Sequence, residues 1–307
     1  MKKAYFFIDD VIWVLRDITR EKPASIFDNA FMKMLKDAHD KYGLKTQLNL
    51  FYRTDTYYKY DVFTLAEVPD VYKEEFSANS DWLKFAFHAL QEFPDYPHVN
   101  ATYEDTKWLF ENIKKEVTRF AGENSFTYVT DPHWDSMSYE GVRALKDCGV
   151  KLLYTTYGAT AEYNGDPSSL PYGHAARLIH NHQPETLTYT RTHSGDDIAR
   201  SICSYNHVTE EAAQSVLRTD KALYDEKTGL YLKPFSEVTL NLVPENEMEA
   251  AFATQPDWDY FGICLHEQYF YPDYFGYQPE YARKILKMCE IMTKAGYTFI
   301  NGDEILN

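Results

Sequence analysis

Residues 4–15 read AYFFIDDVIWVL, an apolar run that is interrupted by two adjacent acids, Asp9 and Asp10. Such a run predicts a buried β-strand that carries the acids at its carboxyl end. Because successive side chains of a strand point to opposite faces, one acid can bind a cation while the other faces a reactant. Either acid taken alone could simply form a turn. The pair together predicts a site with a metal ion or a proton acceptor nearby.

Three later apolar runs end on a histidine, at residues 82–88, 126–133 and 260–266. The carboxyl ends of the parallel strands of an α/β barrel meet at one rim, and polar side chains gathered there form the site. A lone histidine is more often structural, so the prediction rests on the repetition. We expect the four strand ends to share one rim.

Strand and helix patterns alternate along most of the chain. The predicted strands are 4–9, 47–52, 82–88, 126–130, 151–155, 260–265 and 297–300, and the predicted longer helices are 26–42, 103–120, 138–147 and 279–295. This alternation predicts an α/β fold with a parallel sheet, closed as a distorted (β/α) barrel of about seven strands.

The alternation is interrupted after Gly158, where turn-forming residues become frequent. We therefore expect an inserted α+β segment at 158–235, with a strand at 186–192 and a helix at 210–224. Residues 1–157 and 236–307 would then form the barrel domain.

The chain is strongly acidic, with a net charge of -16 over 307 residues. A surface of this charge repels nucleic acid and anionic membranes, so neither is an expected partner. The four cysteines form no Cys-x-x-Cys pair, and no apolar stretch is long enough to span a membrane. Together with the missing leader-peptide cleavage site, these features predict a cytoplasmic protein.

His88 and Glu92 are four residues apart and would share a face if residues 88–92 formed a helical turn. With Asp10 they would give a set of two carboxylates and one imidazole, which suits zinc or another first-row metal. His98 is a candidate for a further imidazole. A capped turn with an ion-paired Glu92 is the structural alternative.

Four segments resemble, in order, the motifs of the polysaccharide deacetylase (NodB-homology) superfamily. They are residues 7–11 (FIDDV), 88–92 (HALQE), 130–134 (TDPHW) and 265–266 (LH). Glu92 stands where the second motif of the family has its second histidine. The resemblance covers roughly residues 4–157 and 236–305 and implies the distorted (β/α) barrel of that family.

The resemblance also implies roles for these residues. Asp9 would be the catalytic base, and His266 the general acid. Independently of the resemblance, the neighbouring carboxylate of Glu267 could orient the His266 imidazole or favour its charged form. A divalent cation, expected to be zinc, would be bound by Asp10, His88 and Glu92. The remaining candidates are His133, as a ligand or substrate donor, and His98, as a further ligand. Trp134, Tyr269 and Tyr271 are candidates for walls that stack on a sugar, with core packing as the alternative for each.

The predicted function is metal-dependent hydrolysis of an N-acyl C–N bond on a carbohydrate. Two alternatives remain open from the sequence. Paired carboxylates, Asp9 or Asp10 with Glu267, could cleave a glycosidic bond. The barrel could also bind carbohydrate without catalysing a reaction, because a fold does not determine a function.

Overall fold

The computed structural model describes residues 2–55, 61–93, 97–98, 101–135, 137–155, 222–234, 238–255 and 259–306. The chain divides into two compact units. Unit 1 contains Met1–Phe87, Asn112–Thr127 and Ser236–Asn307, and unit 2 contains His88–Glu111 and Tyr128–Phe235. We describe each unit by itself.

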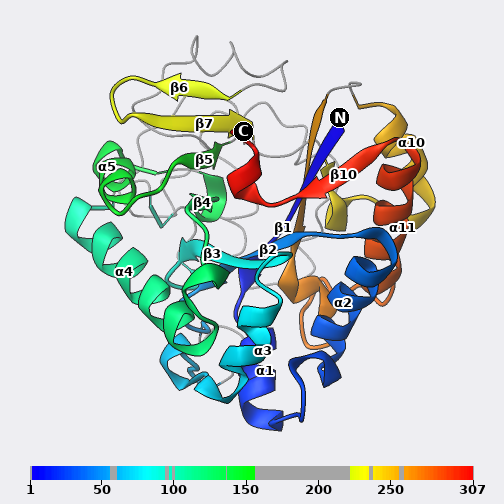
Figure 1. Cartoon of the computed structure of the whole chain (residues 1–307), viewed down its shortest axis with the longest axis horizontal. Coiled ribbons are helices and arrows are strands. Elements are labelled where there is room, and N and C mark those ends of the chain that lie inside the picture. The colour runs from blue at the N-terminus through cyan, green and yellow to red at the C-terminus, as the bar shows by residue number, and fades with distance from the viewer. Residues whose placement is uncertain are drawn as a thin grey trace. The chain divides into compact units, whose positions relative to one another are not determined.

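The main sheet has the strand order β3-β2-β1-β9-β8, and β10 also pairs with β1 (Figure 1). Strand β1 is parallel to β2, β9 and β10, and β8 is parallel to β9. The strand bounds are β1 Lys2–Val11, β2 Thr46–Phe51, β3 Leu83–Ala89, β8 Val238–Thr239, β9 Tyr260–His266 and β10 Tyr297–Ile300. His88 and Ala89, at the end of β3, are counted in unit 2.

Strand β1 forms the centre of the unit 1 core. The side chains of residues 4–8 are at most 1% exposed, as expected for a strand that is covered on both faces. The parallel register pairs Asp9 with His266, so the predicted first motif and last motif lie side by side on β1 and β9.

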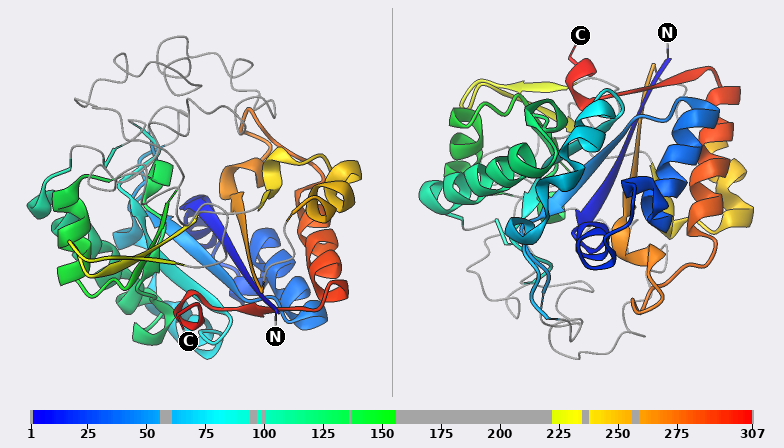
Figure 2. Two further views of the ribbon diagram at one scale, coloured as in Figure 1. Left: turned by 90° about the horizontal axis from the view of Figure 1, so that it is seen from above. Right: turned by 60° about the horizontal axis from the view of Figure 1, so that its bottom comes forward.

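Helices cover the sheet of unit 1, and Figure 2 shows α2 and α11 packed next to each other. Asn29 caps α2 through its side chain, and Gly43 ends that helix in the left-handed conformation. The helix bounds are α1 Trp13–Glu21, α2 Ala30–Tyr42, α3 Lys73–Ala78, α10 Met248–Ala253 and α11 Tyr281–Lys294. Helix α4, Tyr103–Phe120, contributes residues to both units.

Unit 2 contains a smaller sheet with the order β4-β5-β7-β6. Its strands are β4 Val129–Thr130, β5 Leu152–Thr155, β6 Leu223–Asp225 and β7 Leu230–Pro234, and its second helix is α5 Tyr139–Asp147. Strands β4, β5 and β7 are parallel, whereas β6 and β7 form an antiparallel hairpin. Ser138 accepts a hydrogen bond from Gly141 N at the start of α5 and therefore caps it.

The structure confirms the predicted α/β class and the mostly parallel sheet. Helix α4 has the predicted bounds, and Thr102 accepts a hydrogen bond from Asp105 N at its start. The helix predicted at 26–42 is divided, because Asn29 caps a new helix after the short 3-10 turn Ile26–Asp28. Closure of the sheet into a barrel remains a prediction.

Two further differences concern residues with functional expectations. Residues 88–92 form no helical turn, because β3 continues through Ala89 and a bend follows. The end of the helix predicted at 210–224 is strand β6 instead. Strand β7 of the predicted insertion pairs with β5, while the strand predicted at 186–192 lies outside the described residues.

No described helix combines the length and hydropathy that crossing a lipid bilayer requires.

Candidate functional site

Asp9 lies at the carboxyl end of β1 and is 2% exposed. Asn49 Nδ2 donates a hydrogen bond of 2.6 Å to its Oδ1, and Cys264 Sγ donates one of 3.2 Å to its Oδ2. Asn49 is itself held by Gln47 Nε2, which donates to Asn49 Oδ1 at 2.6 Å. Both carboxylate oxygens of Asp9 are thus fixed in direction by buried donors from β2 and β9.

Asp10 adopts a backbone conformation that is rare for residues with a side chain. Its φ angle is 64°, and the register between β1 and β2 shifts between Ile8 and Val11. A left-handed residue other than glycine costs of order 1–3 kcal/mol, and such strain concentrates at functional sites. Asp10 is buried, and because its backbone departs from the extended conformation, its side chain does not follow the simple alternation of a strand after Asp9.

His266 ends β9, beside Asp9 in the parallel register. Its Nδ1 lies 2.9 Å from Asn241 Oδ1. Because the amide oxygen of Asn241 can only accept, Nδ1 carries the proton of the neutral ring and Nε2 carries the lone pair. Tyr281 Oη donates to the backbone carbonyl of His266 at 3.1 Å, which fixes the end of the strand.

Glu267 does not contact the His266 ring in the way that the sequence predicted. Its Oε2 accepts from Ile12 N and Trp13 N, both at 2.8 Å, and its Oε1 accepts from Val14 N at 2.7 Å. These are donors that the start of α1 leaves without a partner inside the helix. Burial raises the pKa of the Glu267 carboxyl to about 8, although the hydrogen bonds from the three backbone donors act to lower it. Glu267 is therefore a cap of α1, and Asn241 is the partner of His266.

Unit 2 brings His88 and His133 together. Both are buried, and His133 Nδ1 lies 3.1 Å from His88 Nε2. The outer nitrogen of each ring contacts a backbone carbonyl, His88 Nδ1 that of Asp131 and His133 Nε2 that of Glu92 at 3.1 Å.

These two carbonyls fix the state of the histidine pair. A carbonyl can only accept, so each outer nitrogen must carry a proton. In neutral rings the two facing nitrogens then both carry lone pairs, and neither can donate to the other. A shared cation, either a proton or a metal ion, relieves this repulsion. Metal-binding histidines typically donate their second ring nitrogen to a carbonyl or carboxylate in this way.

Glu92 and His98 both make contacts with the histidine pair through backbone carbonyl groups. Glu92 contributes its backbone carbonyl to His133, and the role of its carboxylate as a ligand stays a prediction. His98 Nε2 lies 2.9 Å from the carbonyl oxygen of His88. Burial lowers the pKa of His98 to about 3, so this ring is neutral near pH 7 and supports the end of β3.

His133 belongs to a strained turn. Trp134 and Asp135 both have positive φ angles, 64° and 48°, in the 3-10 turn His133–Asp135. Asp135 N donates to Pro132 O at 2.7 Å and closes the turn. Two successive left-handed residues with side chains are costly, and they set the direction of the His133 ring.

The three aromatic residues predicted to stack on a sugar differ in their surroundings. Tyr271 is buried against Trp13, with ring centroids 5.1 Å apart, and therefore belongs to the core of unit 1. Tyr269 is also buried, 5.0 Å from the ring of Tyr274. Trp134 is only half-buried, so it presents more ring surface than the other two.

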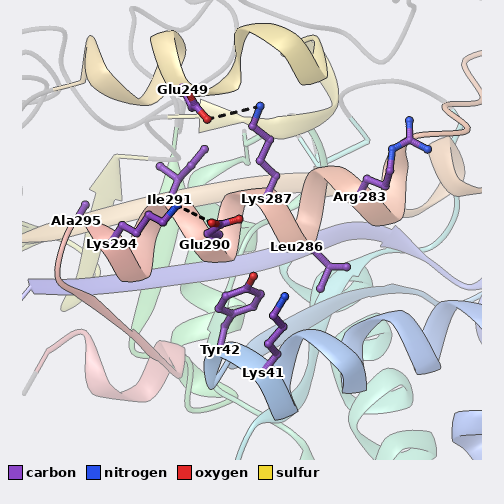
Figure 3. A pocket seen from close by; sticks show the side chains of 10 residues that line it. All are labelled: Lys41, Tyr42, Glu249, Arg283, Leu286, Lys287, Glu290, Ile291, Lys294 and Ala295. Carbon is purple, nitrogen blue, oxygen red and sulfur yellow. Dashed lines mark ion pairs between the residues drawn. The ribbon is translucent and has the colours of Figure 1, made fainter.

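A groove in unit 1 contains none of the predicted site residues (Figure 3). It is lined by α2, α10 and α11, and two ion pairs lie in it, Lys287 with Glu249 at 3.9 Å and Lys294 with Glu290 at 2.5 Å. Because none of the predicted site residues lines this groove, we do not assign the chemistry to it.

Sequence reasoning missed Asn49, Asn241 and Cys264. Asn49 had a signal, because Gln47 and Asn49 place polar side chains on one face of an otherwise apolar strand. Asn241 and Cys264 had none, since their partners are distant in the chain.

A scan against models of known protein families finds no match, and a search of curated proteins finds none either. Solved structures do match. A 4-alpha-glucanotransferase from Thermococcus litoralis has a TM-score of 0.53 at 10% identity, and the match covers 99% of this chain. The present chain spans only 40% of the length of that enzyme. This match concerns the fold alone.

Two further solved structures match over most of their length with lower scores. A family 4 acetyl xylan esterase from Clostridium thermocellum, solved with a cobalt ion, has a TM-score of 0.47 at 11% identity, with 99% of this chain and 90% of that chain covered. A polysaccharide deacetylase from Mycobacterium smegmatis, described as putative, has the same score and identity over 99% and 88%.

Proposed function

We propose that this protein is a metal-dependent hydrolase of the polysaccharide deacetylase type, which cleaves an N-acyl C–N bond on a carbohydrate. The observation that carries the proposal is the buried His88–His133 pair, whose facing nitrogens lie 3.1 Å apart and can hold a shared cation. The motifs around Asp9, His88, His133 and His266 support the reaction class.

The donor set fits a divalent ion. Two neutral imidazoles, each with its outer nitrogen on a carbonyl, are suited to zinc or another first-row metal. Such an ion supplies Lewis acidity and activates water. That Asp10 contributes a carboxylate to the same ion rests on the sequence motif alone.

Asp9 and His266 would transfer the protons of the reaction. Asp9, fixed by Asn49, would accept the proton of the attacking water, and the C–O bond would form at the acyl carbon. His266 in its protonated form would then donate from Nε2 to the leaving nitrogen as the C–N bond breaks. Asn241 keeps Nδ1 protonated and so assigns this task to Nε2.

The glycosidase alternative is weakened, because both oxygens of Glu267 accept backbone hydrogen bonds from α1.

We also propose, from the sequence, a closed barrel, a cytoplasmic location, a carbohydrate substrate and zinc as the ion.

The proposal is tested by metal analysis and acetate release from N-acetylated oligosaccharides. The parent protein should bind a divalent ion at the His88–His133 pair, and His88→Ala and His133→Ala should each bind one ion fewer than the parent, because each removes an imidazole. Asp10→Ala should also lose the ion, whereas Asp9→Asn should keep it and lose turnover. His39→Gln, which changes a histidine on α2, is the matched control.

The other outcomes separate the alternatives. A metal-free parent that added zinc or cobalt does not activate would contradict the hydrolase. New reducing ends without acetate would indicate a glycosidase, and saturable binding without turnover would indicate a binding protein.

A further inference from the structure

Three potential metal ligands of unit 1 lie on adjacent strands. Cys264 and His266 are two residues apart on β9 and therefore share a face, and Asp9 is the register partner of His266 on β1. One ligand atom from each side chain lies within 4.8 Å of the other two. The sulfur of Cys264 and Oδ2 of Asp9 are only 3.2 Å apart, about the separation of two ligands on one zinc ion.

Side-chain amides support two of these groups from outside. Asn49 Nδ2 donates to Oδ1 of Asp9, and Asn241 Oδ1 accepts from Nδ1 of His266. The Asp9 oxygen that faces the thiol and the imidazole nitrogen of His266 that carries the lone pair are the candidate ligand atoms. Outer partners that orient a carboxylate and fix a histidine tautomer are the usual surroundings of bound metal.

The surroundings are also buried. Asp9, Asn49 and Cys264 are each at most 2% exposed, and Gln47 extends the polar row. Burying polar groups is costly unless they are hydrogen-bonded, and these side chains are hydrogen-bonded to one another. Cys264 thus places a soft sulfur next to an oxygen and a nitrogen that can also act as ligands.

We infer that Asp9, Cys264 and His266 form a second cation site, separate from the His88–His133 pair, that selects a thiophilic divalent ion such as zinc, cobalt or cadmium. On binding, the S–H bond breaks, a sulfur–metal bond forms and the proton passes to solvent. One oxygen, one sulfur and one nitrogen ligand suit these ions and disfavour magnesium and calcium.

Metal binding at this second site does not depend on the proposed function. Its expected effect on hydrolysis does rest on that function. Asp9 and His266 are the proposed base and acid, so an ion that occupies both inhibits hydrolysis. Excess zinc should therefore slow acetate release, with an inhibition constant equal to the dissociation constant of this second site.

The binding is tested by titrating the metal-free full chain with Co²⁺ and recording thiolate-to-cobalt charge-transfer absorption. The parent should show this absorption, and Cys264→Ser should abolish it. Cys148→Ser is the matched control, because that cysteine ends α5 in unit 2 and should leave the absorption unchanged. Absorption that persists in folded Cys264→Ser overturns the inference.

A second variant covers the case in which Cys264→Ser does not fold. Asn49→Ala keeps all three ligands and removes only the amide behind Asp9, so Co²⁺ should bind about 10–100-fold more weakly at this site. Unchanged affinity overturns the inference, as does a parent without the absorption. Neither result depends on acetate release, so failure of this site and failure of the proposed hydrolase are distinguishable.

Discussion

Lys284 is a buried residue whose protonation should affect the stability of the fold. Its side chain is 1% exposed on α11, and Nζ donates to Gln278 Oε1 at 2.8 Å. Gln278 in turn donates to the carbonyl of Asn241, the residue that holds His266. Burial lowers the pKa of Lys284 to about 8, because the ammonium loses its hydration.

The lowered pKa predicts a pH dependence of stability. Unfolded Lys284 keeps its proton up to its ordinary pKa of 10.5, so between about pH 8 and that value unfolding takes up a proton. The free energy of unfolding should therefore rise with pH in this window, by about 1–3 kcal/mol in total. Urea denaturation at several pH values measures it.

Lys284→Met should remove this rise, while Lys294→Met, on the exposed side of the same helix, should retain it. A parent whose stability is flat across the window would show that Lys284 titrates normally.

At the scale of elements, α1 depends on a residue far away in the chain. Its own N-cap residue, Ile12, offers no side-chain hydrogen bond, and Glu267 satisfies three backbone donors instead. The helix follows directly after Asp9 and Asp10, so this cap also fixes where the acids stand.

Truncating the cap should destabilise the protein. Glu267→Ala leaves three buried N–H groups without their acceptor and should lower the free energy of unfolding by about 2 kcal/mol or more. Glu267→Gln, which keeps one acceptor oxygen, should cost less.

Glu21→Ala, an exposed change in the last turn of α1, is the control and should stay within about 0.5 kcal/mol of the parent. If Glu267→Ala were equally neutral in a chemical denaturation experiment, Glu267 would not stabilise α1.

At the scale of the whole molecule, the net charge of -16 sets the response to salt. Like charges repel more in the compact state than in the expanded chain, and salt shortens the range of this repulsion to about 8 Å at physiological strength.

The midpoint of thermal unfolding should therefore rise when sodium chloride is added from low to physiological strength. Potassium chloride should give the same rise, because screening depends on ionic strength and not on the ion. A midpoint that falls with salt would show that the exposed ion pairs, such as Lys33–Asp37, outweigh the repulsion.

Several strands and helices were determined by the sequence itself. Helix α4 and strands β1 and β9 lie where periodicity and capping residues predict them, because these signals act between near neighbours. The acids and histidines at the strand ends could be found for the same reason.

Only the tertiary structure decided which residues are the partners of these acids and histidines. The pairing of His133 with His88, of Asn241 with His266, of Cys264 with Asp9 and of Glu267 with α1 joins residues from 25 to 255 positions apart. Strand register sets such contacts, and a slip by one residue would turn each side chain to the opposite face. Local patterns identify the residues that can react, but register and strained turns determine which atoms meet.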